Sequence, residues 1–232
     1  MGLVPLAQVI IHNRTATCES RNGFCPDWIV HHLGDYGAPL LRHVELTTAS
    51  VACGFAIAAT LGLLAHRRRW LVGPVVAVTG VLYTIPSLAL FALLLPISGF
   101  GFVTALIALT TYTLLIIFRN VIAGLDNVPA ETRDAARGMG LTDRQLLWRV
   151  ELPLALPEIV AGVRIATTTT VGLATLAFIA GAGGLGQKIL TDIEFKSNIV
   201  VAGGLCVLLA VAFEIAFLLL ERALAPWRRA RG

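Results

Sequence analysis

The amino-acid sequence predicts an all-α membrane protein with five transmembrane helices, an external N-terminus and a cytoplasmic C-terminus. The 232 residues are 56% apolar and 14% charged, whereas soluble domains are about 45–50% apolar and about 25% charged. The apolar residues form five runs, each near the ~20 residues that a helix needs to cross a bilayer. Of the 18 Lys and Arg residues, all but five fall on one side of this topology, which the positive-inside rule makes the cytoplasmic side. The five are Arg14, Arg21, Arg42, Lys188 and Lys196.

Residues 1–37 are expected to form an external or interfacial segment. Its apolar piece is too short to span a bilayer, and it lacks the basic start and the cleavage site of a signal peptide. Trp28 and Tyr36 are candidates for anchors at the membrane interface. Cys18 and Cys25 could form a disulfide in an oxidising compartment, or remain two free thiols.

The first span is predicted at residues 40–64, and the basic cluster that follows it, residues 66–70, indicates the cytoplasm. The second span, at residues 71–95, is interrupted by Pro86, which removes a backbone hydrogen bond and kinks a helix. The hydroxyls of Thr84 and Ser87 could cover the freed carbonyl. The bend either lines a transport pathway, together with Tyr83, or is a packing kink.

Three further spans are predicted at residues 102–118, 158–182 and 199–220. The fourth contains a run of four threonines whose hydroxyls can bond back to their own chain or across to another helix. Joining helices is the favoured role, with a place for Thr168 on a substrate pathway as the alternative. Glu214 is a carboxylate well inside the fifth span. Intramembrane charges usually face a cavity or a partner, so Glu214 either lines the pathway or pairs with Arg164 or Arg119.

Several patterns resemble those of soluble enzymes without their context. The GxGxxG run at residues 181–186 follows a membrane-length segment rather than a short strand, so a flexible turn at the outer mouth is the better interpretation. Adjacent His31 and His32 have no further ligands for a metal. No nucleophilic triad stands out, and the basic residues are scattered in loops. We therefore expect no metal, no cofactor, no enzymatic activity and no nucleic-acid partner for this chain.

Residues 127–157, called the coupling loop below, are too charged to lie in lipid. Pro129 and the glycines at 138 and 140 predict a short helix over about residues 129–138. Thr142 and Gln145 form a capping box that predicts a second helix over about residues 143–150. Pro153 is expected to end that helix and Pro157 to begin the fourth span. The two helices form either a rigid docking element or a simple connector.

This loop resembles the EAA loop of binding-protein-dependent ABC importer permeases, in which Glu-Ala-Ala, three residues, Gly, nine residues and Ile-x-Leu-Pro follow one another. Here Asp134-Ala135-Ala136, Gly140 and Val150-Glu151-Leu152-Pro153 stand at these positions, with Asp for Glu and Val for Ile. The runs at residues 84–89, 152–157 and 181–186 are similar to those of the osmoprotectant branch, which imports glycine betaine, carnitine, choline or proline betaine.

The resemblance implies a MetI-like, type I ABC importer permease domain over residues 38–222, followed by a basic cytoplasmic tail at 223–232, in the bacterial cytoplasmic (plasma) membrane. It implies a second permease subunit, identical or paralogous, two ATPase subunits at the cytoplasmic face and an external substrate-binding protein. ATP and Mg²⁺ would then bind to the ATPase. The residues implied in coupling to the ATPase are Asp134, Ala135, Ala136, Gly140, Leu141, Thr142, Arg144 and Pro153.

Other functions remain open. An amino-acid or ergothioneine permease would share the same architecture. An ion-coupled secondary carrier would need intramembrane ionisable groups and usually repeat symmetry, for which Glu214 alone is thin support. A membrane enzyme would need polar groups that converge at one depth, and the sequence shows none.

Overall fold

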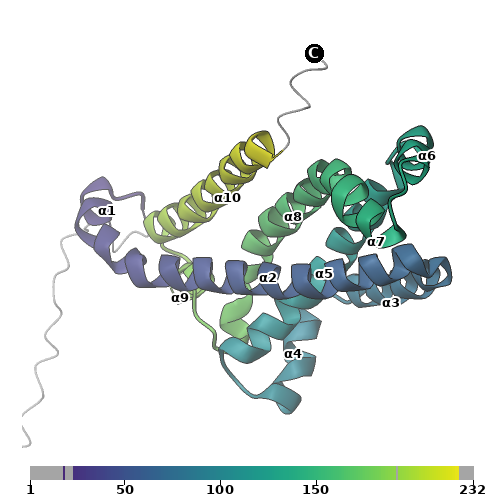
Figure 1. Cartoon of the computed structure of the whole chain (residues 1–232). Helices are drawn as coiled ribbons and strands as arrows, with labels where there is room; N and C mark the ends of the chain where they lie inside the picture. Colours follow the sequence, from purple (N-terminus) through teal and green to yellow (C-terminus); the bar gives the residue numbers. More distant parts are fainter. Residues whose placement is uncertain (1–17, 19–22, 192, 225–232) are drawn as a thin grey trace, which may run out of the picture.

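The computed structural model describes residues 18, 23–191 and 193–224, and all regular elements in them are helical (Figure 1). The elements in chain order are α1 (Pro26–His32), η2 (Leu33–Tyr36), α2 (Gly37–Arg67), η3 (Arg69–Leu71), α3 (Val72–Thr84), α4 (Ser87–Ser98), α5 (Phe102–Asp126), α6 (Ala130–Gly138), α7 (Asp143–Leu146), η4 (Leu147–Glu151), α8 (Leu152–Ala174), η5 (Ala177–Ala180), α9 (Leu185–Thr191) and α10 (Lys196–Leu224).

Helix α5 forms the centre of the fold, and α2 and α8 make the most extensive contacts with it. Small residues bring these helices close together. A Cβ atom at Gly54 or Gly62 of α2 would collide with side chains of α5, and one at Gly162 of α8 would collide with Asn120. Helices in membranes often pack through small residues, because lipid provides no hydrophobic force that drives them together. The glycines of α2 and α8 therefore fix how closely the three helices approach.

The predicted spans are only partly recovered as single helices. In the described residues, three helical stretches are long and apolar enough to cross a membrane: Pro26–Arg67, Phe102–Asp126 and Lys196–Leu224. Helix α8 covers residues 152–174 rather than 158–182 and carries Glu158 and Arg164. The protein is thus an all-helical membrane protein, while the count of five spans stays a prediction.

The second predicted span is broken rather than kinked. Helices α3 and α4 meet at 97°, because Ile85 and Pro86 are extended, with ψ angles of 127° and 132°. A residue before proline is disfavoured in the helical region, which explains the extended Ile85. Thr84 donates within its own helix, to the carbonyl of Val81. The carbonyl of Ile85 instead accepts a hydrogen bond of 2.6 Å from the Tyr112 hydroxyl of α5, so α5 holds the break in place.

The glycine-rich run at residues 181–186 is a turn packed against neighbouring helices, and its flexibility stays a prediction. Gly181, Gly183 and Gly184 have φ angles of 70°, 80° and 90°, which favour glycine over other residues. His43 of α2 is buried, and its Nδ1 accepts a hydrogen bond of 3.4 Å from the Leu185 amide. Because Nδ1 is the acceptor, Nε2 carries the proton and donates it to the Val171 carbonyl at 2.9 Å. The turn is therefore held by α2.

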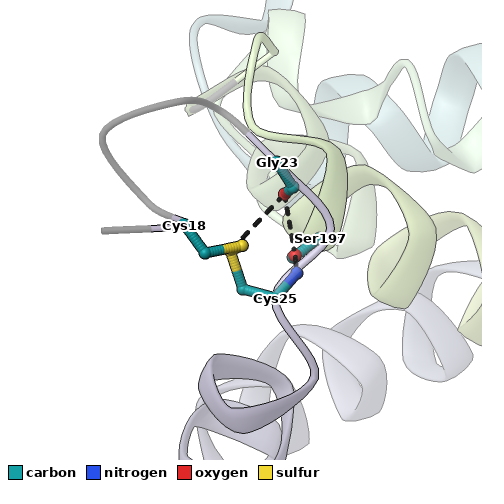
Figure 2. Close-up of a disulfide and its surroundings, with 4 residues drawn as sticks. All are labelled: Cys18, Gly23, Cys25 and Ser197. Atoms are coloured by element: carbon teal, nitrogen blue, oxygen red, sulfur yellow. Dashed lines mark hydrogen bonds between the residues drawn. A yellow bond between two sulfur atoms is a disulfide. The ribbon is translucent and has the colours of Figure 1, made fainter. Parts of the chain in front are cut away.

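The chain before α2 packs on the start of α10. Cys18 and Cys25 form a disulfide, with their Cα atoms 5.7 Å apart (Figure 2). The Cys25 amide donates to the Ser197 hydroxyl at 2.7 Å, and this hydroxyl donates to the Gly23 carbonyl at 3.2 Å. The Tyr36 hydroxyl donates to the side-chain carbonyl of Asn198. Tyr36 is buried by these contacts, so the prediction that it anchors the chain at the membrane interface is wrong.

Candidate functional site: the coupling loop

Helix α6 begins directly after Pro129 and ends at Gly138, which confirms the first helix predicted in the coupling loop. Its ending is a Schellman motif: the Leu141 amide donates to the Ala136 carbonyl at 3.2 Å, and the Gly140 amide donates to the Arg137 carbonyl at 2.9 Å. The φ angle of 83° at Gly140 makes this geometry accessible. The motif satisfies carbonyls that the helix end leaves unpaired, so the turn between the two loop helices is well defined.

The second helix starts with the predicted capping box. The Gln145 amide donates to the Thr142 hydroxyl at 3.4 Å, and the Thr142 amide donates to the Gln145 side-chain oxygen at 2.9 Å. Such a reciprocal pair satisfies two backbone donors that a helix start otherwise leaves open. Sequence and structure agree here because every partner lies within four residues.

The prediction that Pro153 ends the second helix is wrong. After α7 the chain forms the π-helical turn η4, whose closing bond joins the Leu152 amide to the Leu147 carbonyl. Helix α8 follows without a break, with Pro153 in its first turn and Pro157 inside it. Proline lacks a backbone donor, and a wider turn before it accommodates the missing bond. The loop therefore continues directly into α8, so a displacement of α7 acts on α8.

The predicted coupling residues divide between an exposed and a packed group. Ala136 is buried, and Leu141 and Pro153 are half-buried; Asp134, Ala135, Gly140, Thr142 and Arg144 are exposed. Two large side chains that the sequence did not mark as coupling residues are also exposed, Met139 at 74% and Trp148 at 58%. Exposed apolar side chains among charged ones are typical of a surface that binds another protein.

Below this surface lies a cluster of three ionisable residues, called the Glu151 cluster, which sequence reasoning missed. Glu151 is 5% exposed. Its Oε2 lies 3.0 Å from Nε2 of His66, at the end of α2, and its Oε1 lies 2.9 Å from Nε of Arg133, on α6. Arg133 also donates through Nη2 to the carbonyl of Leu125, at the end of α5. Because 85 residues separate His66 from Glu151, no local pattern could have predicted this contact.

An adjoining hollow of about 740 Å³ is lined by three arginines, two carboxylates and His66, and the charged residues are Arg67, Arg137, Arg144, Asp143 and Glu151. Arg137 also lies 3.7 Å from Asp134 of its own helix. In the part of the chain that the structure describes, no group of three or more His, Cys, Asp or Glu side chains could hold a metal ion. The arrangement offers exposed surface and positive charge for binding a partner.

The residues predicted for a substrate pathway fall into two groups. Tyr83, Thr84, Pro86 and Ser87 lie at the break between α3 and α4, where the Tyr83 ring stands edge-on to Tyr112 with centroids 6.0 Å apart. Glu214 of α10 lies 3.3 Å from Arg164 of α8, and Thr168 donates back to the Arg164 carbonyl at 3.1 Å. Within the described residues, no hydrogen bond or ion pair joins the two groups. Three hydroxyls of the threonine run donate to carbonyls of their own helix, those of Thr167, Thr168 and Thr170. The structure therefore shows them bonded within α8 and not to another helix.

Comparison with known proteins gives consistent results. The family described as "Binding-protein-dependent transport system inner membrane component" matches residues 53–229. The osmoprotectant import permease protein OsmW of Salmonella typhimurium is 35% identical over 206 residues, which cover 86% of this chain and 96% of that protein. The choline transport system permease protein OpuBB of Bacillus subtilis is 33% identical, with 85% of this chain and 94% of that protein covered.

Two solved structures share the fold. The inward-facing MetNI methionine ABC transporter has a chain with a TM-score of 0.72 and 27% identity, and the match covers 82% of this chain and 95% of that one. An amino acid ABC transporter crystallised with histidines has a TM-score of 0.71 at 18% identity, covering 84% of this chain and 97% of that one. At that identity the second likeness concerns the fold alone.

Proposed function

Because the chain belongs to the family of binding-protein-dependent transport system inner membrane components, we propose that it is the permease subunit of an ATP-driven importer of compatible solutes. The substrate class is glycine betaine, carnitine, choline or proline betaine, supported by relatives named for osmoprotectant and choline transport that are covered almost completely. The observation that carries the proposal is the coupling loop, whose two helices are both capped and whose second helix continues unbroken into α8.

The loop is the surface on which a separate ATPase docks at the cytoplasmic face. Asp134 and Arg144 give it charge, and exposed Met139 and Trp148 give it apolar contact area. Two ATPase subunits bind beneath this permease and a second one, identical or paralogous. ATP binding favours one of two arrangements of the permeases, inward-open or outward-open, and can shift their populations only through contacts that differ between the two. The ATP and Mg²⁺ belong to the ATPase, so this chain itself is not the enzyme.

The proposed topology has five spans, with the N-terminus outside. Helix α8 is counted as a span because the ion pair between its Arg164 and Glu214 of α10 offsets part of the cost of charge in the membrane. The bent pair α3 and α4 is counted as one broken span, the second along the chain. The disulfide between Cys18 and Cys25 supports an external N-terminus, since disulfides persist in oxidising compartments.

Solute passes along the broken span, where Tyr83, Thr84, Pro86 and Ser87 lie at or beside the break between α3 and α4. Broken helices in membranes are tolerated where their free backbone groups are covered by protein or line a cavity. Tight selection of the solute belongs to the external binding protein. An ion-coupled secondary carrier is disfavoured because its one candidate coupling carboxylate, Glu214, lies beside Arg164.

A second candidate is a permease for an amino acid, favoured by the likeness to the methionine transporter. ATP-dependent uptake separates the two. The chain is co-expressed with its ATPase and binding protein and reconstituted in proteoliposomes, and uptake of radiolabelled glycine betaine, choline and methionine is measured with ATP and with a non-hydrolysable analogue. We expect uptake of a quaternary ammonium solute that requires ATP. Uptake of methionine alone would favour the second candidate, and uptake driven by an ion gradient without ATP would contradict both.

A further inference from the structure

Helix α6 is attached to the rest of the protein by few side chains. Of its nine residues, only Ala136 is buried, and a single small side chain removes little apolar surface from water. Arg133 of α6 is half-buried. Its side chain reaches inward to Glu151 and to the carbonyl of Leu125. The position of α6 relative to the membrane helices therefore depends on Arg133 to an unusual degree.

Glu151 lies where these contacts meet. Its two carboxylate oxygens bind different segments: one faces Arg133 of α6 and the other faces His66 of α2. Glu151 itself is the last residue of η4, directly before α8. A carboxylate with 5% of its surface exposed is costly to bury unless it is paired, and removing one partner of a buried pair is strongly destabilising. This one side chain thus connects the end of α2, the middle of α6 and the start of α8, and Arg133 adds the end of α5.

The membrane helices at this end already pack as one body. Ala65 of α2, Leu125 of α5 and Ala155 of α8 are buried in the same apolar cluster. The continuous helix from α7 into α8 passes a displacement of the second loop helix to that body. Helix α6, which carries the Asp134-Ala135-Ala136 motif, is separated from α7 by the turn at Gly140 and has no such continuous connection.

We propose that Glu151 and Arg133 are positioning residues that make α6 move together with α2, α5 and α8 when the ATPase changes state. This inference rests on the proposed function for its partner, and it assigns the transmission step to two residues beneath the exposed docking surface. Other ion pairs near this end lie at the surface: Arg137 with Asp134, and Arg69 with Asp126, have side chains 43–74% exposed. Exposed pairs contribute little because water and salt screen them, so they serve as controls.

The first test measures coupling in the reconstituted complex with its ATPase and binding protein. The variants are Glu151→Gln, Arg133→Met and the double variant, with Asp126→Asn as the matched exposed control. We expect each single variant to retain the ATPase on purification and to hydrolyse ATP, while solute taken up per ATP falls about tenfold. The double variant should fall no further than either single one, because both changes break the same contact. Asp126→Asn should stay near wild type.

The second test needs neither solute nor ATPase. Spin labels are attached to cysteines introduced at two exposed positions, Glu131→Cys of α6 and Arg67→Cys of α2. The free cysteines are removed by Cys53→Ser and Cys206→Ser, and the distribution of distances between the labels is measured by double electron–electron resonance. We expect Glu151→Gln and Arg133→Met to broaden this distance distribution, and Asp126→Asn to leave it unchanged.

These readouts separate the inference from the proposed function. If wild type takes up no quaternary ammonium solute while the distance distribution still broadens in Glu151→Gln, the solute assignment fails and the attachment of α6 stands. Three results would overturn the inference: an unchanged ratio of uptake to hydrolysis, multiplicative losses in the double variant, or loss of the ATPase on purification, which would indicate a structural role only.

Discussion

The two ends of α2 are held by different kinds of interaction. At the end that carries the coupling loop, His66 meets a buried ion pair between Glu151 and Arg133. At the N-terminal end, Arg42 and His43 bind backbone groups of residues 182 and 185, and His43 also binds the Val171 carbonyl of α8. The disulfide segment that precedes α2 binds the Ser197 hydroxyl at the start of α10. Figure 1 shows α2 running between the two ends, with α1 near one and α6 and α7 near the other.

The difference has a mechanical consequence. The disulfide and the hydrogen bonds to packed backbone hold the N-terminal segment at several points, whereas the ion pair joins α6 to the membrane helices through two side chains. We therefore expect the N-terminal end to determine stability and the coupling-loop end to determine how motion is passed on. The following predictions test this contrast, beginning with the largest effect.

Gly186→Ala should give the largest loss of stability. A Cβ atom at this position would collide with the backbone of Thr175, which cannot move away as a flexible side chain can. Overpacking of this kind costs about 3 kcal/mol or more. The thermal midpoint of the purified protein, followed by size-exclusion chromatography of a fluorescent fusion, measures the loss. Gly203→Ala in α10 is the control, because nothing lies within 4 Å of its added Cβ atom. Equal midpoints in the two variants would contradict the close contact.

Replacing both Cys18 and Cys25 by serine should lower stability by about 2 kcal/mol, since the bond closes a short loop of eight residues. A membrane-impermeant reductant should have the same effect on wild type in intact cells if the segment is external. Solute taken up per ATP should remain near wild type, in contrast to Glu151→Gln. A fall in that ratio without a fall in thermal midpoint would show that the N-terminal end also takes part in coupling.

The contrast also explains which parts of the molecule the sequence could predict. The capping box at Thr142 and the Schellman motif at Gly140 involve partners within a few residues, so local chemistry is sufficient to predict them. The Glu151 cluster joins residues far apart in the chain and required the packing of α2 against α5 and α8 to be known first.

The effects of Pro86 and Pro153 depend on residues outside their local pattern. The effect of Pro153 depends on the π-helical turn before it, and the sharp break at Pro86 is held by Tyr112, a residue of the next helix. A proline removes a backbone donor in either case. Whether the chain then bends, breaks or continues is decided by the surrounding helices, which a local pattern does not contain.

A smaller effect is expected from Gly140→Ala, which tests the rigidity of the loop itself. Nothing lies within 4 Å of the added Cβ atom, so the cost comes from the positive φ angle of 83° alone. That conformation costs about 1–2 kcal/mol for a residue with a Cβ atom. Amide hydrogen exchange should be about tenfold faster at Gly140 and Leu141, whose amides close the Schellman motif. Gly138→Ala, also without a neighbour within 4 Å and with no positive φ angle, should leave their exchange unchanged.

The smallest effect is expected from Thr142→Ala, which removes the side-chain half of the capping box and should cost about 1 kcal/mol. Exchange of the Gln145 amide should be about fivefold faster, because that amide donates to the Thr142 hydroxyl. Thr142→Ser keeps the hydroxyl and should behave as wild type. The Leu185 amide, bound by His43 at the other end of α2, should be unaffected in both. If the Gln145 amide exchanges equally in Thr142→Ala and Thr142→Ser, burial of Leu146 and Leu147 holds the second loop helix, and packing rather than capping then makes the loop rigid.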